Sequence, residues 1–187
     1  MKPLLFKRKM LLVKLESDYD TDPAPDGSNV IVTKSLSINP YEGNKVTRDI
    51  DRDSLGNDIE INTAPYVTVT FDAEIAGSGT AGTAPGYGPL LRACGFSETE
   101  DTGVSVTYQP VSEDFESAAM YFQQSGQLHK VTGCRGTVSF SLARGALPTM
   151  SFTFTGIYHD PVTQAAPTGL DRSAFKMPLP VNSVNTT

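Results

Sequence analysis

Residues 77–82 have the sequence Gly-Ser-Gly-Thr-Ala-Gly, which matches the G-x-G-x-x-G pattern of dinucleotide-binding sites. In such sites the glycines form the turn into a helix, whose first N–H groups meet the pyrophosphate. Here two prolines and two more glycines fall within the next seven residues, so no helix can begin where the phosphates would lie. We therefore interpret residues 77–82 as a structural loop. We predict a short helix at residues 89–94, with Pro89 in its first turn and Gly95 as its terminator.

The strand predicted before this loop, at residues 66–75, also differs from a nucleotide-binding strand. Strands of that kind are buried on both faces and are almost entirely apolar. Residues 66–75 instead alternate strictly, with apolar side chains at the odd positions 67–75 and Thr68, Thr70, Asp72 and Glu74 between them. This alternation predicts a strand with one buried face and one polar face.

The sequence offers little for nucleophilic or metal-dependent catalysis. The two histidines are His129, within a predicted strand, and His159, at a strand end. None of the patterns H-E-x-x-H, G-x-S-x-G or C-x-x-C is present. Paired carboxylates for glycoside hydrolysis are not excluded by composition, but the chain has no Trp on which a sugar could stack. We predict that the protein is not an enzyme and has no catalytic, cofactor-binding or metal-binding residues.

One segment resembles a calcium-binding loop. Asp49, Asp51 and Asp53 alternate and are followed by Glu60, but Ser54 stands where the sharp turn of such a loop requires glycine. Prolines and a glycine on either side also prevent flanking helices. We interpret these acids as the solvated charges of a hairpin, and weak calcium binding at residues 49–60 stays open.

Composition limits the class of protein. The 187 residues suit a single domain with a hydrophobic core, because 39% of them are hydrophobic. The net charge of -6 and the pI near 4.8 argue against a protein that holds nucleic acid through its phosphates. Residues 4–15 are too short and too charged for a membrane span or a secretion signal, and only Cys94 and Cys134 are present, so we expect synthesis in a reducing cytoplasm.

Strand signals dominate the chain. Short β-branched or alternating segments are predicted to be strands at residues 29–38, 66–75, 104–108, 118–122, 128–131, 137–142 and 150–158. Turn residues separate several of them, including Thr132-Gly133. This pattern predicts a mainly β protein, an antiparallel β-sandwich with one short flanking α-helix. The proline-rich tail after Pro161 is predicted to be an extended arm.

The polar face of these strands is rich in hydroxyl groups. Besides Thr68, Thr70, Asp72 and Glu74, this face shows only hydroxyl side chains and no Lys or Arg in the sequence pattern: Ser105, Thr107, Thr137, Ser139, Ser141, Ser151, Thr153 and Thr155. The high β propensity of Thr explains part of this pattern. The alternative is a surface that faces a lumen or a partner subunit, because ordinary solvated faces mix Lys with Glu.

Residues 39–65 form a long, charged excursion between two predicted strands. Such long connections are usually functional or disordered, and this one has too few apolar residues to form its own core. We predict an extended hairpin, with its tip near residues 54–57, that becomes ordered against a partner. Charge is also uneven, because a basic N-terminal segment precedes an acidic block at residues 16–26 and a second at 98–116. These blocks are either solvated loops or contacts between identical copies assembled head to tail.

Several segments resemble one family, and together they cover nearly the whole chain. They are residues 11–16, 18–25, 40–43, 48–49, 72–79, 81–85, 87–96, 108–112, 133–136 and 152–156. The most specific is residues 87–96, Tyr-Gly-Pro-Leu-Leu-Arg-Ala-Cys-Gly-Phe. The chain resembles the major tail tube proteins of long-tailed, non-contractile bacteriophages.

This resemblance implies a single tail tube domain over residues 1–187, with an N-terminal arm (1–27), the excursion (39–65) and a C-terminal arm (161–187). It implies homohexameric rings that stack into a tube, through which viral DNA passes without specific binding. The other implied partners are the tape measure, terminator and distal tail proteins, with no membrane insertion of the protein's own. The implied location is the virion tail, after synthesis in the host cytoplasm.

Two sets of residues follow as candidates. The lumen-facing candidates are Asp72, Glu74, Thr68 and Thr70. The inter-ring contact candidates are Arg48, Asp49, Asp51, Arg52, Asp53, Lys7, Arg8 and Lys9. Two other functions stay open: a tail terminator or head–tail connector ring protein, and a soluble β-sandwich module that binds carbohydrate.

Overall fold

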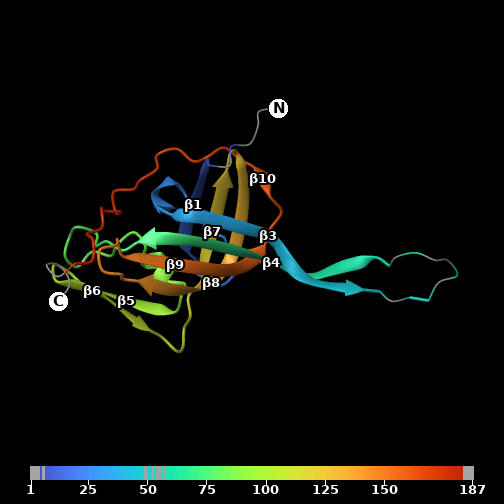
Figure 1. The fold of residues 1–187 in the computed structure, drawn as a ribbon, viewed down its shortest axis with the longest axis horizontal. Helices are drawn as coiled ribbons and strands as arrows, with labels where there is room; N and C mark the ends of the chain where they lie inside the picture. The colour runs from blue at the N-terminus through green and yellow to red at the C-terminus, as the bar shows by residue number, and fades with distance from the viewer. Residues whose placement is uncertain are drawn as a thin grey trace.

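A computed structural model describes residues 5, 7–48, 50–51, 53, 56 and 58–182 (Figure 1). The strands are β1 (Lys9–Leu15), β2 (Val30–Ile31), β3 (Lys34–Thr47), β4 (Glu60–Glu74), β5 (Phe96–Asp101), β6 (Ser105–Pro110), β7 (Ala118–Gln124), β8 (Gln127–Ser141), β9 (Thr149–Tyr158) and β10 (Val162–Thr163). The helices are α1 (Gly88–Arg92) and a 3-10 turn, η1 (Gly27–Asn29). All of the strand pairs are antiparallel, and the mainly β class predicted from the sequence is confirmed.

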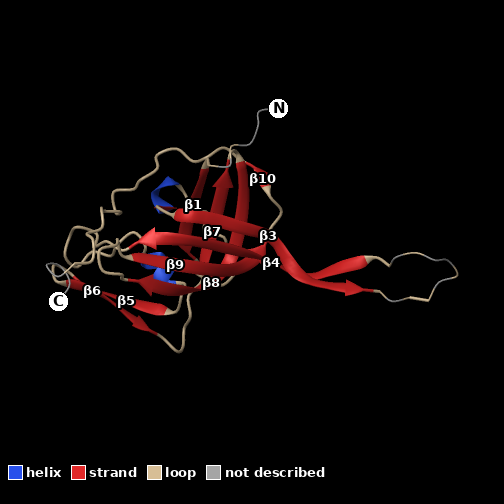
Figure 2. Ribbon diagram, in the orientation of Figure 1, coloured by secondary structure: helices blue, strands red, loops and turns tan. Residues whose placement is uncertain are grey.

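The long strand β8 belongs to both layers of the sandwich. The main sheet has the order β2-β1-β7-β8-β9-β4-β3, in which the first half of β8 pairs with β7 and the second half with β9. Between Thr132 and Arg135 the register shifts, and Gly133 has a φ of 59°, a conformation that favours glycine. The sheet therefore bends over on itself at this bulge, and Figure 2 shows β1 and β7 running across β9 and β4.

The core lies between these two layers. β1 and β7 contribute Leu11, Val13, Met120 and Phe122 from one side, and β4 and β9 contribute apolar side chains from the other. Phe71, Phe152 and Phe154 form a stacked cluster with ring centroids 5.3–5.9 Å apart. The alternation predicted for residues 66–75 is confirmed, because Val67, Val69, Phe71 and Ala73 are all buried.

The predicted short helix is confirmed, but it starts one residue earlier and ends two residues earlier than the expected 89–94. α1 begins at Gly88 with Pro89 in its first turn, and Gly95 follows it with a φ of 84°. The preceding glycine run packs as a loop on the turn between β5 and β6. At Gly82, which has a φ of 70°, a Cβ atom would lie 2.2 Å from the carbonyl oxygen of Asp101. Close packing and backbone conformation therefore account for this glycine.

Three sequence predictions about strands are wrong. Residues 29–38 are divided between β2 and β3, and β3 continues through Pro40 to Thr47. A register shift between Asn39 and Glu42 accommodates Pro40, which lies on an edge strand where a missing N–H is tolerated. The predicted turn at Thr132-Gly133 is instead the bulge inside β8, so two predicted strands are one.

Part of the predicted N-terminal arm is strand β1, which pairs with β7 and buries Leu11, Leu12 and Val13. The five charges between residues 2 and 14 obscured this strand. β5 was also missed because its alternate residues are acidic. β5 and β6 form a separate two-stranded sheet, so Ser105 and Thr107 do not join the polar face of the main sheet.

The acidic block at residues 16–22 stabilises the bulge of β8 through hydrogen bonds. The Glu16 carboxylate accepts hydrogen bonds from the Gly133 N–H (2.7 Å) and from the Ser117 hydroxyl (2.6 Å). Asp20 accepts from the buried Thr132 hydroxyl at 2.5 Å. These acids therefore bind their own chain, in contrast to the solvated loop or inter-copy contact that we expected from charge alone.

Residues 164–182, within the predicted C-terminal arm, run back along the body. Asp171 N–H donates to Gly27 O (3.0 Å), and Phe175 packs against the main core. Near its end, Val181 exchanges backbone hydrogen bonds with the loop after β8, to Gly145 (2.8 Å) and Ala146 (3.0 Å). We call this segment the C-terminal strap.

Replacing Phe154 with Ala should lower the free energy of unfolding by about 3–5 kcal/mol, because the side chain is fully buried among aromatic rings. Its neighbour Thr153 is exposed on the opposite face, so Thr153→Ala should change stability by less than about 0.5 kcal/mol. Urea unfolding of both variants measures the difference. Equal costs would contradict the placement of the core.

Asp22 should make stability depend on pH. Burial alone would raise the pKa of Asp22, but hydrogen bonds from Tyr121, from Ala24 N–H and from Lys130 outweigh it and lower the pKa below its ordinary 3.8. The stabilisation is therefore complete above about pH 3.8 and is lost as the pH falls through the lowered value. Asp22→Asn and Tyr121→Phe should each flatten the dependence of Tm on pH below 4. A slope as steep as that of the wild type in both variants would contradict this assignment.

Candidate assembly surfaces

One face of the layer formed by β3, β4, β9 and β8 is lined by hydroxyls and carboxylates. We call it the hydroxyl face, and its residues are Thr68, Thr70, Asp72 and Glu74 of β4, Thr149, Ser151, Thr153 and Thr155 of β9, and Thr137, Ser139 and Ser141 of β8. They form cross-strand rows, such as Thr70–Thr153–Thr137 and Asp72–Ser151–Ser139. The four lumen candidates therefore lie together on the side of β4 opposite the core, as their alternation predicted.

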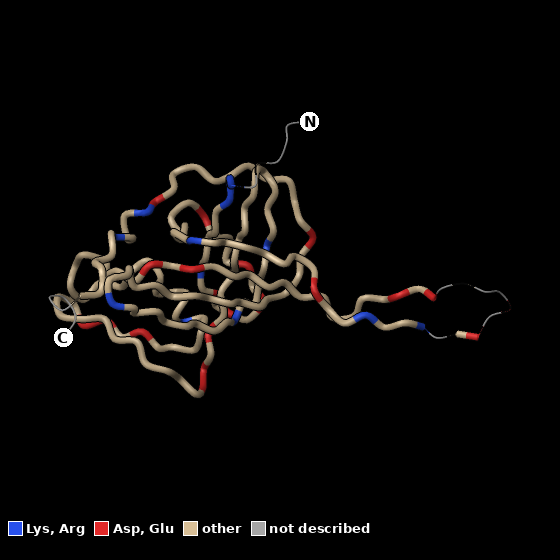
Figure 3. Tube along the Cα trace, viewed as in Figure 1, with Lys and Arg blue, Asp and Glu red and all other residues tan. Residues whose placement is uncertain are grey.

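The hydroxyl face carries positive charge, which corrects one expectation. Lys34, at the start of β3, forms an ion pair with Glu74, and Arg135 lies at the other end of the face beside Thr155. Figure 3 shows how Lys and Arg are distributed along the chain relative to Asp and Glu. Sequence could not reveal Lys34 because the alignment of β3 with β4 contains three register shifts. Asp72 has a neutral partner, since it accepts a hydrogen bond from the Ser151 hydroxyl at 2.5 Å.

Both edges of this four-stranded layer lack a neighbouring strand within the described residues. β3 ends the sheet order, and the second half of β8 extends beyond its last pair with β7, Ala118–Cys134. Each edge is covered only at one end. The Lys9 ammonium donates to Leu36 O on β3, and Gly136 N–H donates to Ala93 O after α1 (3.2 Å).

The Gly136 contact fixes which way the β8 backbone groups point. Because Gly136 N–H points away from β9, the alternation of an antiparallel ladder directs the N–H and C=O of Val138 and Phe140 outward too. The layer thus ends in hydrogen-bonding groups that a strand of another chain can pair with.

The excursion is a β-hairpin that projects from the body (Figure 1). β9 pairs with β4 only as far as Tyr66, and the hairpin strands continue beyond it through Asn44–Thr63 to Thr47–Glu60. Bulges at the base, with Ala64 at a φ of 52°, turn the hairpin away from the sheet. Among the described residues near its tip, Val46, Ile50, Ile59 and Ile61 are exposed.

The inter-ring candidates divide into two groups that the structure does not bring together. Arg48, Asp51 and Asp53 are exposed near the hairpin tip, whereas Asp49 and Arg52 lie outside the described residues, as does most of the predicted tip at 54–57. Lys7, Arg8 and Lys9 lie at the start of β1, where Arg8 O accepts from Ser125 N–H (3.0 Å) in the β7–β8 turn.

An apolar groove that the sequence patterns did not predict lies between the strap and the end of β4. Its lining includes Ile75, Leu142, Pro148 and residues 177–181, and its volume is about 530 Å³. The only signal in the sequence was the run Met-Pro-Leu-Pro-Val at 177–181, which composition alone marks as an extended arm.

The histidines and cysteines take structural positions. His159 Nε2 lies 2.6 Å from the Thr132 hydroxyl, and His129, whose pKa is lowered by burial, packs edge-on against Phe122. Burial raises the pKa of the Cys94 thiol to about 12 and also raises that of Cys134. Within the described residues, no three His, Cys, Asp or Glu side chains are grouped to hold a metal ion. No helix in the same part of the chain has the length and apolar character of a membrane span.

The sandwich has open sheet edges, a projecting hairpin and a polar outer sheet face. These features are typical of a structural protein that assembles with other subunits. The chain belongs to the phage tail tube protein family, whose model matches residues 7–187. No curated protein matches the chain. Membership makes this a structural protein of the virion tail, which assembles with itself and with other tail proteins.

Proposed function

We propose that this protein forms homohexameric rings that stack into the tail tube and conduct the viral genome into the host cell. The observation that carries the proposal is the pair of open edges on the four-stranded layer. Along β3, β4, β9 and β8 the strand direction alternates, so β8 of one copy beside β3 of the next continues the antiparallel order. The contact is heterologous and forms a closed ring when the rotation between copies closes.

Ring closure joins the four-stranded layers into one continuous barrel, which leaves no open edge in the layer. One face of each layer is already occupied by the core, so the hydroxyl face is the one that lines the lumen. Its carboxylates repel DNA phosphates, and its hydroxyls interact with them without a charge. Lys34 is ion-paired with Glu74, and the Arg135 guanidinium donates to Phe115 O (2.8 Å), so both of these cations are engaged by their own chain and are less available to slow the DNA.

The family resemblance is the basis for four parts of this proposal. They are the six copies in a ring, the stacking of rings through hairpins, the tape measure, terminator and distal tail proteins as partners, and synthesis in the host cytoplasm. Electron microscopy of the purified protein tests the proposal. Long tubes of uniform width support it. Isolated rings would indicate a terminator or connector, and monomers would indicate a soluble binding module.

Val138→Pro should abolish tubes while the monomer stays folded. The proline removes an outward N–H that the ring contact uses, and an edge position tolerates that loss within the chain. Ser139→Pro is the matched control, because it removes an N–H directed at β9 and should unfold the protein at lower temperature. Size-exclusion chromatography and microscopy measure assembly. Normal tubes from Val138→Pro would contradict the proposed ring contact.

Asp72→Lys combined with Glu74→Lys should slow or abolish DNA ejection while tubes still assemble. The two lysines reverse the charge of the β4 row and give phosphates cationic partners along the lumen. Asp72→Asn with Glu74→Gln serves as the control, since it removes charge without adding cations. Ejection from purified virions is the measurement, and wild-type infectivity of the double lysine variant would exclude these residues as lumen groups.

A further inference from the structure

The apolar groove lies at the opposite end of β4 from the hairpin. The strand spans 15 residues, with the hairpin at its Glu60 end and the groove after its Glu74 end. At about 3.3 Å per residue, the two features lie roughly 45 Å apart along one strand. Copies arranged head to tail along this direction would bring the hairpin of one toward the groove of the next.

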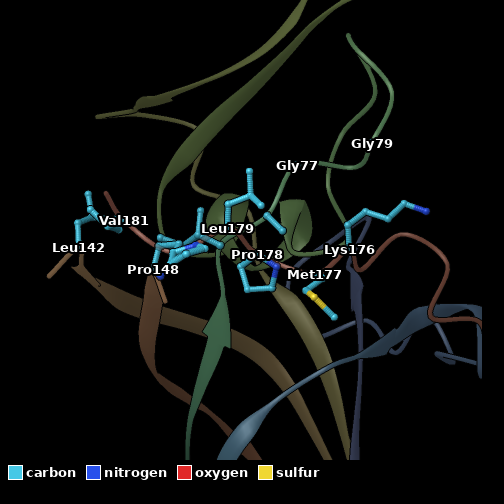
Figure 4. Close-up of a pocket in the computed structure, with 12 residues that line it drawn as sticks. Gly77, Gly79, Leu142, Pro148, Lys176, Met177, Pro178, Leu179 and Val181 are labelled. Atoms are coloured by element: carbon cyan, nitrogen blue, oxygen red, sulfur yellow. The ribbon is translucent and has the colours of Figure 1, made fainter. Parts of the chain in front are cut away.

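The groove presents unusually exposed apolar side chains. Met177 is 91% exposed, Leu179 69% and Leu142 60%, all beside a groove whose other wall is Ile75 to Gly79 (Figure 4). The strap holds this shape through the backbone hydrogen bonds of Val181 to Gly145 and Ala146. A contiguous apolar patch of this kind on a folded surface marks an interaction site.

The hairpin carries a matching apolar surface that is exposed in the described part of the chain. Ile59 is 65% exposed, and Val46 and Ile61, which pair directly across the two strands, are each about half exposed. β4 extends six residues from Glu60 before it reaches the body at Tyr66, which is about 20 Å of projecting strand. These side chains can be buried only by another molecule.

The charges at the two surfaces are also complementary. Among the described residues of the hairpin between 45 and 61, four acids (Asp51, Asp53, Asp58 and Glu60) outnumber two bases (Lys45 and Arg48), and Glu60 forms an ion pair with Lys45. At the groove, Lys176 lies along Gly79 with its ammonium directed outward in Figure 4, and Arg144 precedes the glycine that binds Val181. The hairpin therefore carries a small acidic excess, and the cations of the groove are complementary to it.

We propose that the groove between the C-terminal strap and the end of β4 is the receptor for the hairpin of a second copy of this chain. Ile59 and Ile61 enter the groove against Leu142, Met177 and Leu179. The inference rests on the proposed tube, and it assigns the strap a role as one wall of the ring-to-ring contact.

Paired cysteines test the contact directly. Ile61→Cys with Leu179→Cys should give a ladder of cross-linked chains after mild oxidation of assembled tubes, because each copy both offers a hairpin and receives one. Each single variant should give no ladder. Ile61→Cys with Thr153→Cys, which places the second thiol on the hydroxyl face, should give none either. The native thiols are buried or half-buried and stay in place.

Charge insertions give an independent measurement. Ile61→Asp and Leu179→Asp should each raise the protein concentration needed for tubes about tenfold or more and leave isolated rings, because an apolar contact is lost. Asn44→Asp, which adds the same charge to the hairpin, and Leu179→Met, which keeps an apolar side chain, should assemble normally. All three positions are exposed, so an unchanged Tm should confirm that the four variants fold.

The outcomes separate this inference from the proposed function. Failure of the wild type to form tubes would overturn the function. Tubes of the double-cysteine variant that give no ladder, or tubes of Ile61→Asp that form at the wild-type concentration, would overturn the groove as receptor and leave the tube intact.

Discussion

The bend in β8 is the constraint on which the rest of the structure depends. One 15-residue strand serves both layers, and it changes layer where Gly133 adopts a conformation that other residues rarely reach. Opposite the bend, Gly156 leaves room for it, because a Cβ atom there would lie 2.6 Å from Val131 Cγ1 and 2.7 Å from Cys134 Sγ. The Glu16 carboxylate completes the arrangement by accepting the N–H of Gly133, a group that the bulge removes from the ladder.

The same bend creates the open edge. Because β7 leaves β8 at Cys134, the second half of β8 has β9 on one side only, and its other side carries the outward groups of Val138 and Phe140. In an isolated soluble domain such an edge would be an aggregation hazard. Here the bulge that builds the core of one copy also supplies the pairing edge that the proposed ring uses, so fold and assembly share one local feature.

Local patterns in the sequence predicted the parts of the fold that local chemistry decides. The alternation of residues 66–75, the short helix with Pro89 in its first turn and the loop character of the glycine run all follow from side-chain period and backbone restriction. The predictions from sequence patterns were wrong where contacts between residues far apart in the chain determine the structure. Thr132-Gly133 has the composition of a turn, and contacts with distant residues, among them the Glu16 carboxylate 117 positions away, stabilise it as a bulge. The strand β1 was not predicted because its lysines, which lie at its ends and on its exposed face, interrupt the apolar pattern. Lys34 could be placed on the hydroxyl face only from the structure, because the register of β3 against β4 is shifted.

The exposed apolar side chains are those that a single copy of the chain does not bury in its own core. The core buries its apolar side chains almost completely, yet Ile59, Ile61, Met177 and Leu179 stay exposed at the two ends of the molecule. In a monomer these side chains would favour indiscriminate association, but they are separated along β4 and bordered by opposite charges. In the proposed stack, the small acidic excess of the hairpin and the cations beside the groove favour the heterologous contact over contact between like ends. In that contact, charge favours one direction of stacking and apolar burial supplies the strength.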